Sequence, residues 1–218
     1  MSGSSLRMGF LMDPIDCILP DKDTTFVFMM EAGKRGHDVL YFTPEDMFAS
    51  AGSVHAELRP AAVRHGKPHY KLGDSFEINL KLLDVVFFRT DPPFTMDYLY
   101  QTYLLDLIAD DVFVTNNPRA VRDANEKLFA LHFPDLIPPH IVTNNIRRLK
   151  SFLEGVGGKM VVKPLNRAGG DNVFVIEKGD RNTNAILEMA TDFESRRIIT
   201  QKYVPEARDG DKRILLLV

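Results

Sequence analysis

A short stretch of the chain combines a lysine inside an apolar strand with a glycine pair in the polar loop that follows. Lys163 lies between Val161-Val162 and Pro164, Gly169-Gly170 lies in the loop, and a second apolar strand starts at Val173. A lysine in a buried strand is costly unless an anion meets it. Adjacent glycines let backbone N–H groups approach such an anion, because no Cβ intervenes. The stretch predicts a phosphate-binding hairpin in a nucleotide-using enzyme; the alternative is a lysine that extends its charge to solvent.

The elements that would position this hairpin begin with an alternating pattern. An apolar strand over residues 7–12 is followed by a helix that Asp23 would cap and that ends near Lys34, with Gly36 just beyond. A second apolar strand covers residues 39–42. Strands that are apolar throughout, joined by a helix, predict a parallel sheet covered on both faces.

The next segment, residues 53–80, alternates more between polar and apolar residues and contains a turn-forming run at 64–68. It predicts an antiparallel excursion beside the main sheet. A buried strand over residues 83–88, a helix over about 96–109 and a strand over 112–114 then restore the first pattern. No Gly-x-Gly-x-x-Gly fingerprint follows the first strand, which argues against a dinucleotide-dependent oxidoreductase.

The second half of the chain begins with a predicted helix from Pro118 or Arg119 through Ala130. Three prolines then interrupt regular structure near a predicted domain boundary: Pro134, Pro138 and Pro139. Beyond them we expect strands over 141–142, 197–204 and 212–218, the hairpin over 160–176, a helix capped by Asn144 or Asn145, and a helix around 183–193. The last strand ends without a turn or partner, which predicts a chain truncated at its carboxyl end.

Composition restricts the class of protein. The 218 residues carry a formal net charge of −3, without the basic field typical of nucleic-acid binding. The one cysteine, Cys17, excludes an internal disulfide framework and fits a reducing compartment. His65 and His69 are separated by Gly66 and Pro68, which break the helix that would align them on a metal. No run is apolar enough for a signal peptide or a membrane span. We therefore expect a cytoplasmic protein without nucleic-acid or membrane partners, and no metal ligand in this sequence.

Six short motifs occur in an order that resembles one family. They are Met12-Asp13-Pro14, Arg89-Thr90-Asp91-Pro92-Pro93-Phe94, Asn116-Asn117-Pro118 leading to Asn125-Glu126-Lys127-Leu128, Val162-Lys163-Pro164-Leu165 with Gly169-Gly170, Gln201-Lys202-Tyr203-Val204-Pro205, and Gly210-Asp211-Lys212-Arg213. Each motif is weak by itself. Together, from Met8 to Val218, they resemble the bacterial glutathione synthetases, which are ATP-grasp ligases.

The resemblance implies an α/β fold with two domains. A Rossmann-like pre-ATP-grasp domain on the substrate side, residues 1–124, would be followed by an incomplete ATP-grasp domain, residues 125–218. The first ATP-grasp subdomain would cover about 135–202, with only the start of the second. A homotetramer or a homodimer is the oligomeric state that the family suggests.

The same resemblance implies an ATP-dependent condensation of γ-glutamylcysteine with glycine. ATP would phosphorylate the dipeptide carboxylate, and the glycine amine would displace phosphate from the acyl phosphate, giving glutathione, ADP and phosphate. The protein would supply positioning and charge neutralisation. The cofactors would be ATP and Mg²⁺, whose ligands in the family lie on later strands, expected beyond residue 218. We therefore expect the 218-residue chain alone not to be an efficient catalyst.

Residue roles on the phosphate side follow from the resemblance. Lys163 would contact the ATP phosphates, and Lys127 resembles the family's other lysine on the nucleotide side. Gly169 and Gly170 would lie in the loop that closes over ATP. For Lys127 the alternative is an ordinary surface residue paired with Glu126. The adjoining segment, Gln201, Lys202, Tyr203 and Val204, resembles the one that binds adenine, with plain strand and linker residues as the alternative.

The remaining roles concern the ribose and the peptide. Asp211 would lie near the ribose. Arg213 would be catalytic and would face the acyl phosphate or the dipeptide carboxylate with its bidentate guanidinium. Arg89, Asp91 and Asp13 follow strand ends of the first domain, where open α/β sheets bind ligands, and would shape the substrate side. The alternative for Arg89 and Asp91 is a structural salt bridge that supports the turn after them.

The glycine loop departs from the family pattern, which there resembles Asp-Gly-x-Gly-Gly followed by a small residue. Asn166 and Arg167 replace the start, and Asp171 follows the glycine pair. Arg167 could add positive charge for the phosphates, whereas Asp171 would oppose them. Loss of one glycine also stiffens the loop, so we expect weakened ATP binding or turnover. Thr90, where lysine is common, is a smaller departure.

Two other functions stay open. One is another ATP-grasp carboxylate–amine ligase with a different peptide or amino acid substrate. The other is a non-catalytic nucleotide-binding module, which the altered loop would favour.

Overall fold

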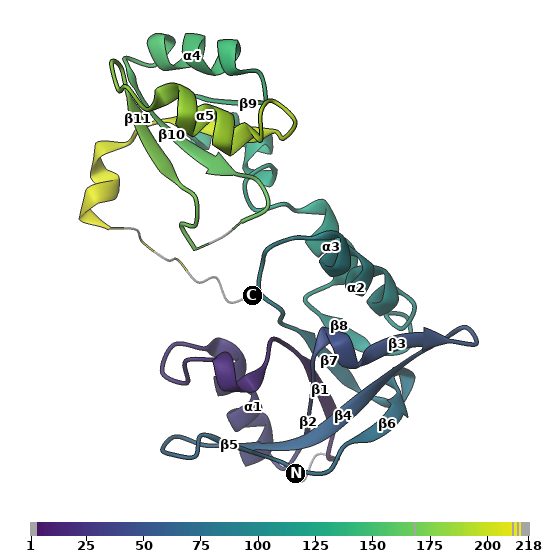
Figure 1. Cartoon of the computed structure of the whole chain (residues 1–218). Helices are drawn as coiled ribbons and strands as arrows, with labels where there is room; N and C mark the ends of the chain where they lie inside the picture. Colours follow the sequence, from purple (N-terminus) through teal and green to yellow (C-terminus); the bar gives the residue numbers. More distant parts are fainter. Residues whose placement is uncertain (1–3, 168, 211, 213, 215–218) are drawn as a thin grey trace. The chain divides into compact units, whose positions relative to one another are not determined.

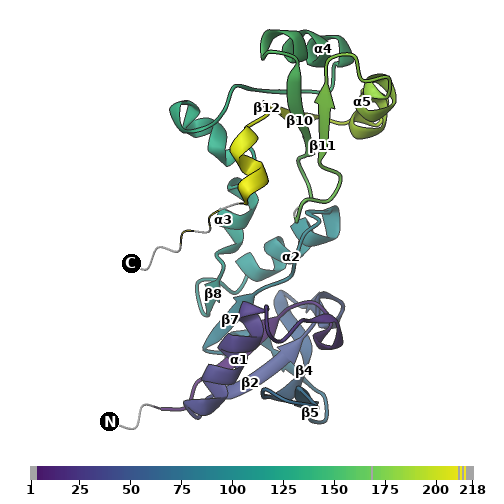
Figure 2. The same ribbon diagram turned by 90° about the vertical axis from the view of Figure 1, so that its left-hand side faces the viewer.

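A computed structural model of the chain describes residues 4–167, 169–210, 212 and 214 (Figure 1). By its internal contacts the chain divides into two units, residues 1–124 and residues 125–218. Each unit has its own sheet and its own hydrophobic core. Figure 2 shows the same elements from a second direction.

The first unit is an α/β unit around an eight-stranded sheet. Its strands are β1 (Arg7–Leu11), β2 (Asp38–Phe42), β3 (Met47–Ser50), β4 (Ser53–Val63), β5 (Tyr70–Leu72), β6 (Phe76–Asn79), β7 (Val85–Phe88) and β8 (Phe113–Thr115). Its helices are α1 (Thr24–Lys34), α2 (Met96–Asp106) and α3 (Pro118–Asp123). The main path of the sheet runs β3-β4-β2-β1-β7-β8, and both β5 and β6 pair with β4.

The strand pairings of this sheet confirm the two predicted parts. β1 pairs in parallel with β2 and β7, and β7 pairs in parallel with β8. The segment from β4 to β6 is antiparallel throughout, as its alternation predicts. Parallel strands end at one edge, so residues that follow β1 and β7 are brought to the same edge of the sheet.

The sheet is buried on both faces because β1 sends successive side chains to different cores. Phe10 belongs to the cluster that contains Met29 of α1, whereas Leu11 belongs to the cluster that contains Leu105 of α2. The Leu83 side chain packs closely against the backbone of Gly9, so a Cβ there would come within 2.7 Å of a methyl carbon of Leu83. This double coverage is the one that the all-apolar strands predict.

The first helix begins and ends where its signals predict. The backbone N–H of Phe26 donates to the Asp23 carboxylate at 2.7 Å, which satisfies one of the free amides at the helix start. α1 ends at Lys34, and Gly36 follows with φ of +79°. Asp23 is therefore held at the carboxyl edge of the parallel strands, beside the residues after β1.

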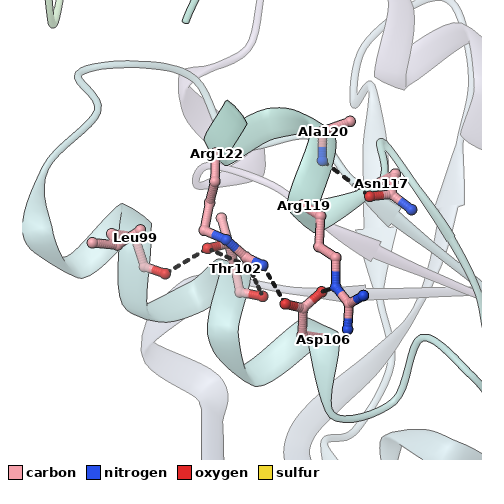
Figure 3. A network of polar contacts seen from close by, with 7 residues as sticks. All are labelled: Leu99, Thr102, Asp106, Asn117, Arg119, Ala120 and Arg122. Carbon is pink, nitrogen blue, oxygen red and sulfur yellow. Dashed lines mark hydrogen bonds and ion pairs between the residues drawn. The ribbon is translucent and has the colours of Figure 1, made fainter. Parts of the chain in front are cut away.

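Helices α2 and α3 are joined by a polar network, shown in Figure 3. Arg122 forms an ion pair with Asp106 and donates to both the carbonyl and the hydroxyl of Thr102, each at 3.1 Å. Arg119 also reaches the Asp106 carboxylate, at 3.5 Å. The Arg122 guanidinium lies 4.8 Å from the centre of the Tyr103 ring. One aspartate on α2 therefore holds two arginines of α3.

The helix predicted from Pro118 through Ala130 is wrong beyond Asp123, and α2 also ends three residues earlier than predicted. The cause after α3 is Asn125, whose side-chain carbonyl accepts from the backbone N–H groups of Lys127 and Leu128. An asparagine that satisfies its own neighbours competes with the helical hydrogen bonds. Lys127 consequently lies in a turn and not on a helix.

The second unit has a four-stranded antiparallel sheet in the order β11-β10-β12-β9. Its strands and helices are β9 (His140–Thr143), α4 (Ile146–Gly155), β10 (Lys159–Pro164), β11 (Phe174–Glu177), α5 (Thr183–Thr191) and β12 (Ile198–Lys202). Asn145 caps α4 by accepting from the N–H of Arg148 at 3.0 Å. α4 and α5 pack on one face of the sheet, where their leucines meet Met160, Val162 and Ile198. The hairpin β10–β11 confirms the predicted strand–loop–strand.

The predicted strand over residues 212–218 falls almost wholly outside the described residues. Only Lys212 and Ile214 of that segment are described, and neither is assigned to a strand.

Candidate functional site

The site around Lys163 is positioned by the alternation of β10. Met160, Val162 and Pro164 are buried beneath the helices, whereas Lys159, Val161 and Lys163 are only half-buried. Successive side chains of a strand point to opposite faces, so Lys163 lies on the face opposite α4 and α5. The lysine is not buried in the core, and an anion that contacts it would bind on the face opposite the helices.

Lys163 has a defined partner on this face. Its Nζ donates to the side-chain carbonyl oxygen of Gln201 on β12, at 2.8 Å. Gln201 pairs with Val161 across the two strands, so the residues share a face in diagonal register. Burial lowers the pKa of Lys163, and the positive charge of Lys127 lowers it further. Two lysines that are distant in sequence therefore act on each other.

Lys127 is held in place by backbone and side-chain contacts. Its side chain is 15% exposed, pairs with the Glu126 carboxylate and donates to the backbone carbonyl of Arg167. The Asn125 side chain donates to the carbonyl of Leu165 at 3.0 Å, which joins the turn to the end of β10. The surface pairing with Glu126 that the sequence left open is thus present, but the lysine also contacts the glycine loop. Sequence reasoning assigned no role to Asn125, although it lies in the motif that contains Lys127.

The glycine loop adopts backbone conformations that favour glycine. Gly169 and Gly170 have φ values of +66° and +81°, and a Cβ on either would meet no atom within 4 Å. The glycines are therefore required by their backbone angles, and space remains above them. Arg167 and Asp171 flank the pair and form an ion pair of 2.7 Å with each other.

The segment predicted to bind adenine lies at the end of β12. The N–H of Lys202 donates to the carbonyl of Pro139, and the N–H of Tyr203 donates to the carbonyl of Lys159. The Tyr203 ring lies 4.4 Å from the Lys159 ammonium and accepts, through its hydroxyl, a hydrogen bond from Arg208. Val204 follows and is 40% exposed. Gln201 thus shares the face of Lys163, whereas Lys202 lies opposite Met160 in the strand register and belongs to the other face. Asp211 and Arg213 lie outside the described residues.

A second cluster forms in the first unit, where β1 and β7 end. Asp13, Arg89 and Asp91 line one pocket of about 450 Å³ together with Asp23 and Thr25. The N–H of Asp91 donates to the Asp13 carboxylate at 2.9 Å, and Nε of Arg89 donates to the Thr25 hydroxyl at 3.1 Å. The three residues predicted for the substrate side therefore come together.

The charged groups of this pocket do not form the salt bridge considered for Arg89 and Asp91. No ion pair joins Arg89 to Asp91 within the described part of the first unit, so the structural pairing considered for them is not observed. Burial raises the pKa of Asp91, and the charges of Asp13 and Asp23 raise it further, against a smaller opposite effect of Arg89. Thr25 and Asp23 were not predicted as site residues; the cap signal located Asp23 but carried no information about the pocket.

Two absences hold for the described residues. No group of three histidine, cysteine, aspartate or glutamate side chains gathers there in a way that could hold a metal ion, so we assign no magnesium ligand among them. None of the helices described is both long and apolar enough to cross a bilayer.

Comparison with known proteins identifies both halves of the chain. Residues 6–122 match the family model of the prokaryotic glutathione synthetase N-terminal domain, and residues 126–218 match that of the prokaryotic glutathione synthetase ATP-grasp domain. Glutathione synthetase from Salmonella typhimurium is 37% identical over 214 residues, which cover 97% of this chain and 68% of the relative. The relative from Gloeobacter violaceus is 36% identical over 219 residues.

Solved structures share the fold. D-cycloserine synthetase DcsG aligns with a TM-score of 0.62 at 14% identity, over 92% of this chain and 60% of that one. A RimK-domain ATP-grasp protein from Sphaerobacter thermophilus aligns with a TM-score of 0.59 at 18% identity, over 91% of this chain and 64% of that one. The chain therefore spans about two thirds of the length of these proteins. With family models matching almost its whole length, it belongs to the prokaryotic glutathione synthetase family of ATP-grasp carbon–nitrogen ligases.

Proposed function

We propose that the protein catalyses the ATP-dependent ligation of γ-glutamylcysteine and glycine. The γ-phosphoryl group of ATP is transferred to the free carboxylate of the dipeptide, which converts a poor electrophile into an acyl phosphate with a good leaving group. The glycine amine attacks the acyl carbon, the C–O bond to phosphate breaks, and the amine proton is lost to solvent. The products are glutathione, ADP and phosphate.

The observation that carries the proposal is the meeting of Lys163, Lys127 and the glycine loop in the second unit. Lys127 contacts the loop that carries two left-handed glycines, and its charge acts on Lys163. Phosphoryl transfer is catalysed largely by positioning and by neutralising the charge on the transferring group. Lys163 and Lys127 neutralise that charge in this proposal, and the loop closes over the phosphates.

The other predicted residues keep their assigned roles as parts of the proposal. The segment from Gln201 to Val204 holds adenine, Asp211 lies near the ribose, and Arg213 faces the acyl phosphate. Asp13, Arg89 and Asp91 hold the peptide, and their convergence in one pocket supports this role. Magnesium, when bound, would neutralise charge on the phosphate oxygens. In this proposal the protein binds ATP, the dipeptide and glycine. It forms a homodimer or a homotetramer and acts in the cytoplasm.

The test of the nucleotide site is equilibrium binding of the ATP analogue AMPPNP to the full chain, with magnesium present. Removing one charged donor from a phosphate site costs about 1.5–3 kcal/mol, so we expect Lys163→Met to weaken binding by about 10- to 100-fold. Lys150→Met is the matched control, because Lys150 is an exposed lysine of α4 and lies on the opposite side of the sheet. Equal affinities of the two variants would contradict the site.

The reaction is tested by ADP release with one substrate omitted at a time. Release that needs both γ-glutamylcysteine and glycine supports the proposal. Release that needs another acid or amine would identify a different carboxylate–amine ligase. Binding of AMPPNP without release under any of these conditions would favour a nucleotide-binding module.

A further inference from the structure

The loop that carries Gly169 and Gly170 is closed by an ion pair of its own. Nη1 of Arg167 and Oδ2 of Asp171 are 2.7 Å apart, four residues apart in sequence, and they span both glycines. The two side chains are about half exposed, at 47% and 51%. Exposed pairs of this kind are weak and are screened by salt, so a stronger anion can displace the carboxylate.

The backbone of Arg167 contacts one of the two lysines of the site. Its carbonyl accepts from Nζ of Lys127, and the charge of Lys127 in turn lowers the pKa of Lys163. Lys127 therefore contacts the backbone of the loop, and the Arg167 side chain is paired with Asp171. A guanidinium binds phosphate with two parallel hydrogen bonds, which an ammonium cannot do.

We propose that Arg167 is a third phosphate-binding cation and that Asp171 holds it as a clasp until nucleotide binds. The triphosphate takes the guanidinium from Asp171, and the ion pair opens. Asp171 is then a competitor of the nucleotide and not a ligand for it. This inference rests on the proposed nucleotide site.

The test is a double-mutant cycle on AMPPNP affinity in the full chain. We expect Arg167→Gln to weaken binding about tenfold, because it removes a charge-assisted contact. Asp171→Asn is expected to tighten binding about fivefold, because it both frees Arg167 and removes a negative charge. In the Arg167→Gln background the same change is expected to tighten binding about twofold at most, since only the charge effect is left.

The chain offers a matched control pair. Arg196 and Asp192 have the same spacing of four residues and similar exposure, 54% and 57%, at the end of α5. Arg196→Gln and Asp192→Asn are expected to leave AMPPNP affinity unchanged. Adenosine, which has no phosphate, is expected to bind wild type and Asp171→Asn equally well.

The outcomes distinguish failure of the clasp from failure of the nucleotide site on which it depends. Loss of AMPPNP binding in Lys163→Met, together with equal effects of Asp171→Asn in both backgrounds, would overturn the clasp and leave the nucleotide site standing. Weaker binding by Asp171→Asn would overturn it as well. If the wild-type chain bound no AMPPNP, or if Lys163→Met bound it normally, the nucleotide site and the clasp would fail together.

An independent measurement observes the arginine directly. The NMR signal of the Arg167 Nε–H group, assigned by its loss in Arg167→Gln, is expected to shift when AMPPNP is added. In Asp171→Asn it is expected to start from a different position and to reach a nearly common bound position. A signal that does not respond to AMPPNP would contradict the exchange of partners.

Discussion

At the scale of single residues, each of the two candidate sites brings side chains of like charge close together. Lys163 is half-buried near another lysine, and Asp91 lies near two other aspartates. Both pKa values move toward the neutral form of the side chain, which is costly for the fold and is favourable only when a ligand of opposite charge arrives. Lys163 and Asp91, which are partly buried although they lie near like charges, are thus also residues with a proposed role.

The raised pKa of Asp91 makes a prediction about stability and pH. A carboxylate whose pKa is higher in the folded than in the unfolded state contributes stability that is complete below the unfolded pKa and is lost as pH rises through the folded one. Asp91→Asn removes this loss, so we expect the variant to be more stable than wild type to urea at neutral pH. The difference should shrink as pH falls toward 3.8, the ordinary value for aspartate.

The control for this comparison is Asp110→Asn, which changes an exposed aspartate after α2. Its urea midpoint is expected to follow that of wild type at all pH values. A wild-type chain more stable than Asp91→Asn at neutral pH would show that the carboxylate is stabilised by its neighbours, and the assigned direction of its pKa would be wrong.

At the scale of elements, capping residues and polar contacts decide where helices end and how they join. Asp23 and Asn145 begin α1 and α4 in agreement with the signals in the sequence. Asn125 ends the predicted long helix early, because its side chain accepts from the N–H groups of Lys127 and Leu128 and donates to the carbonyl of Leu165, just after β10. This break brings Lys127 to the glycine loop, so an element boundary positions a site residue.

The network between α2 and α3 predicts unequal effects for two arginines that share one carboxylate. Arg122 is 16% exposed and Arg119 is 75% exposed, and both contact Asp106 (Figure 3). Replacing Arg122 by Met removes the closer of two donors from a largely buried carboxylate, and it also removes the Arg122 contacts of two Thr102 oxygens. We expect it to lower the free energy of unfolding by about 2 kcal/mol.

Arg119→Met is the matched variant. We expect it to lower the free energy of unfolding by at most about 0.5 kcal/mol, because the Arg119 side chain of the pair is exposed. Both values are obtained from urea unfolding curves that monitor the first unit. Equal costs would mean that burial of the Arg122 pair does not determine its contribution.

At the scale of the whole molecule, the two units have separate cores. Two buried clusters fill the first unit, and one cluster beneath α4 and α5 fills the second. A substitution in one core should therefore weaken its own sheet before the other.

Leu149→Ala tests this division. Leu149 is fully buried in the core of the second unit, and a buried Leu→Ala change typically costs about 3 kcal/mol. We expect hydrogen exchange to become faster at the amides of β10 and β12, with those of β1 and β7 unchanged. Lys150→Ala, at the exposed neighbouring position of α4, is the control. Faster exchange in both sheets to the same extent would show that the units unfold as one.

Local elements and the chemistry of the sites could be predicted from the sequence. The apolar strands predicted at 7–12 and 39–42 indicated a parallel sheet, and Asp23 indicated a helix start. The lysine and the glycine pair of the hairpin indicated a phosphate site. These signals are short in range: a cap acts over three residues, a strand pattern over a few, and a glycine on its own φ. The six motifs in order also indicated the family that the comparisons confirm.

Only the tertiary structure decided which of these residues meet. The bond between Lys163 and Gln201 depends on the register of two antiparallel strands, and a shift of one residue would separate them. The convergence of Asp13, Arg89 and Asp91 depends on β1 and β7 being parallel neighbours with a common edge. The pairing of Arg167 with Asp171 depends on a loop conformation that the sequence left open. Contacts between distant residues follow from how elements pack, and no local pattern carries that information.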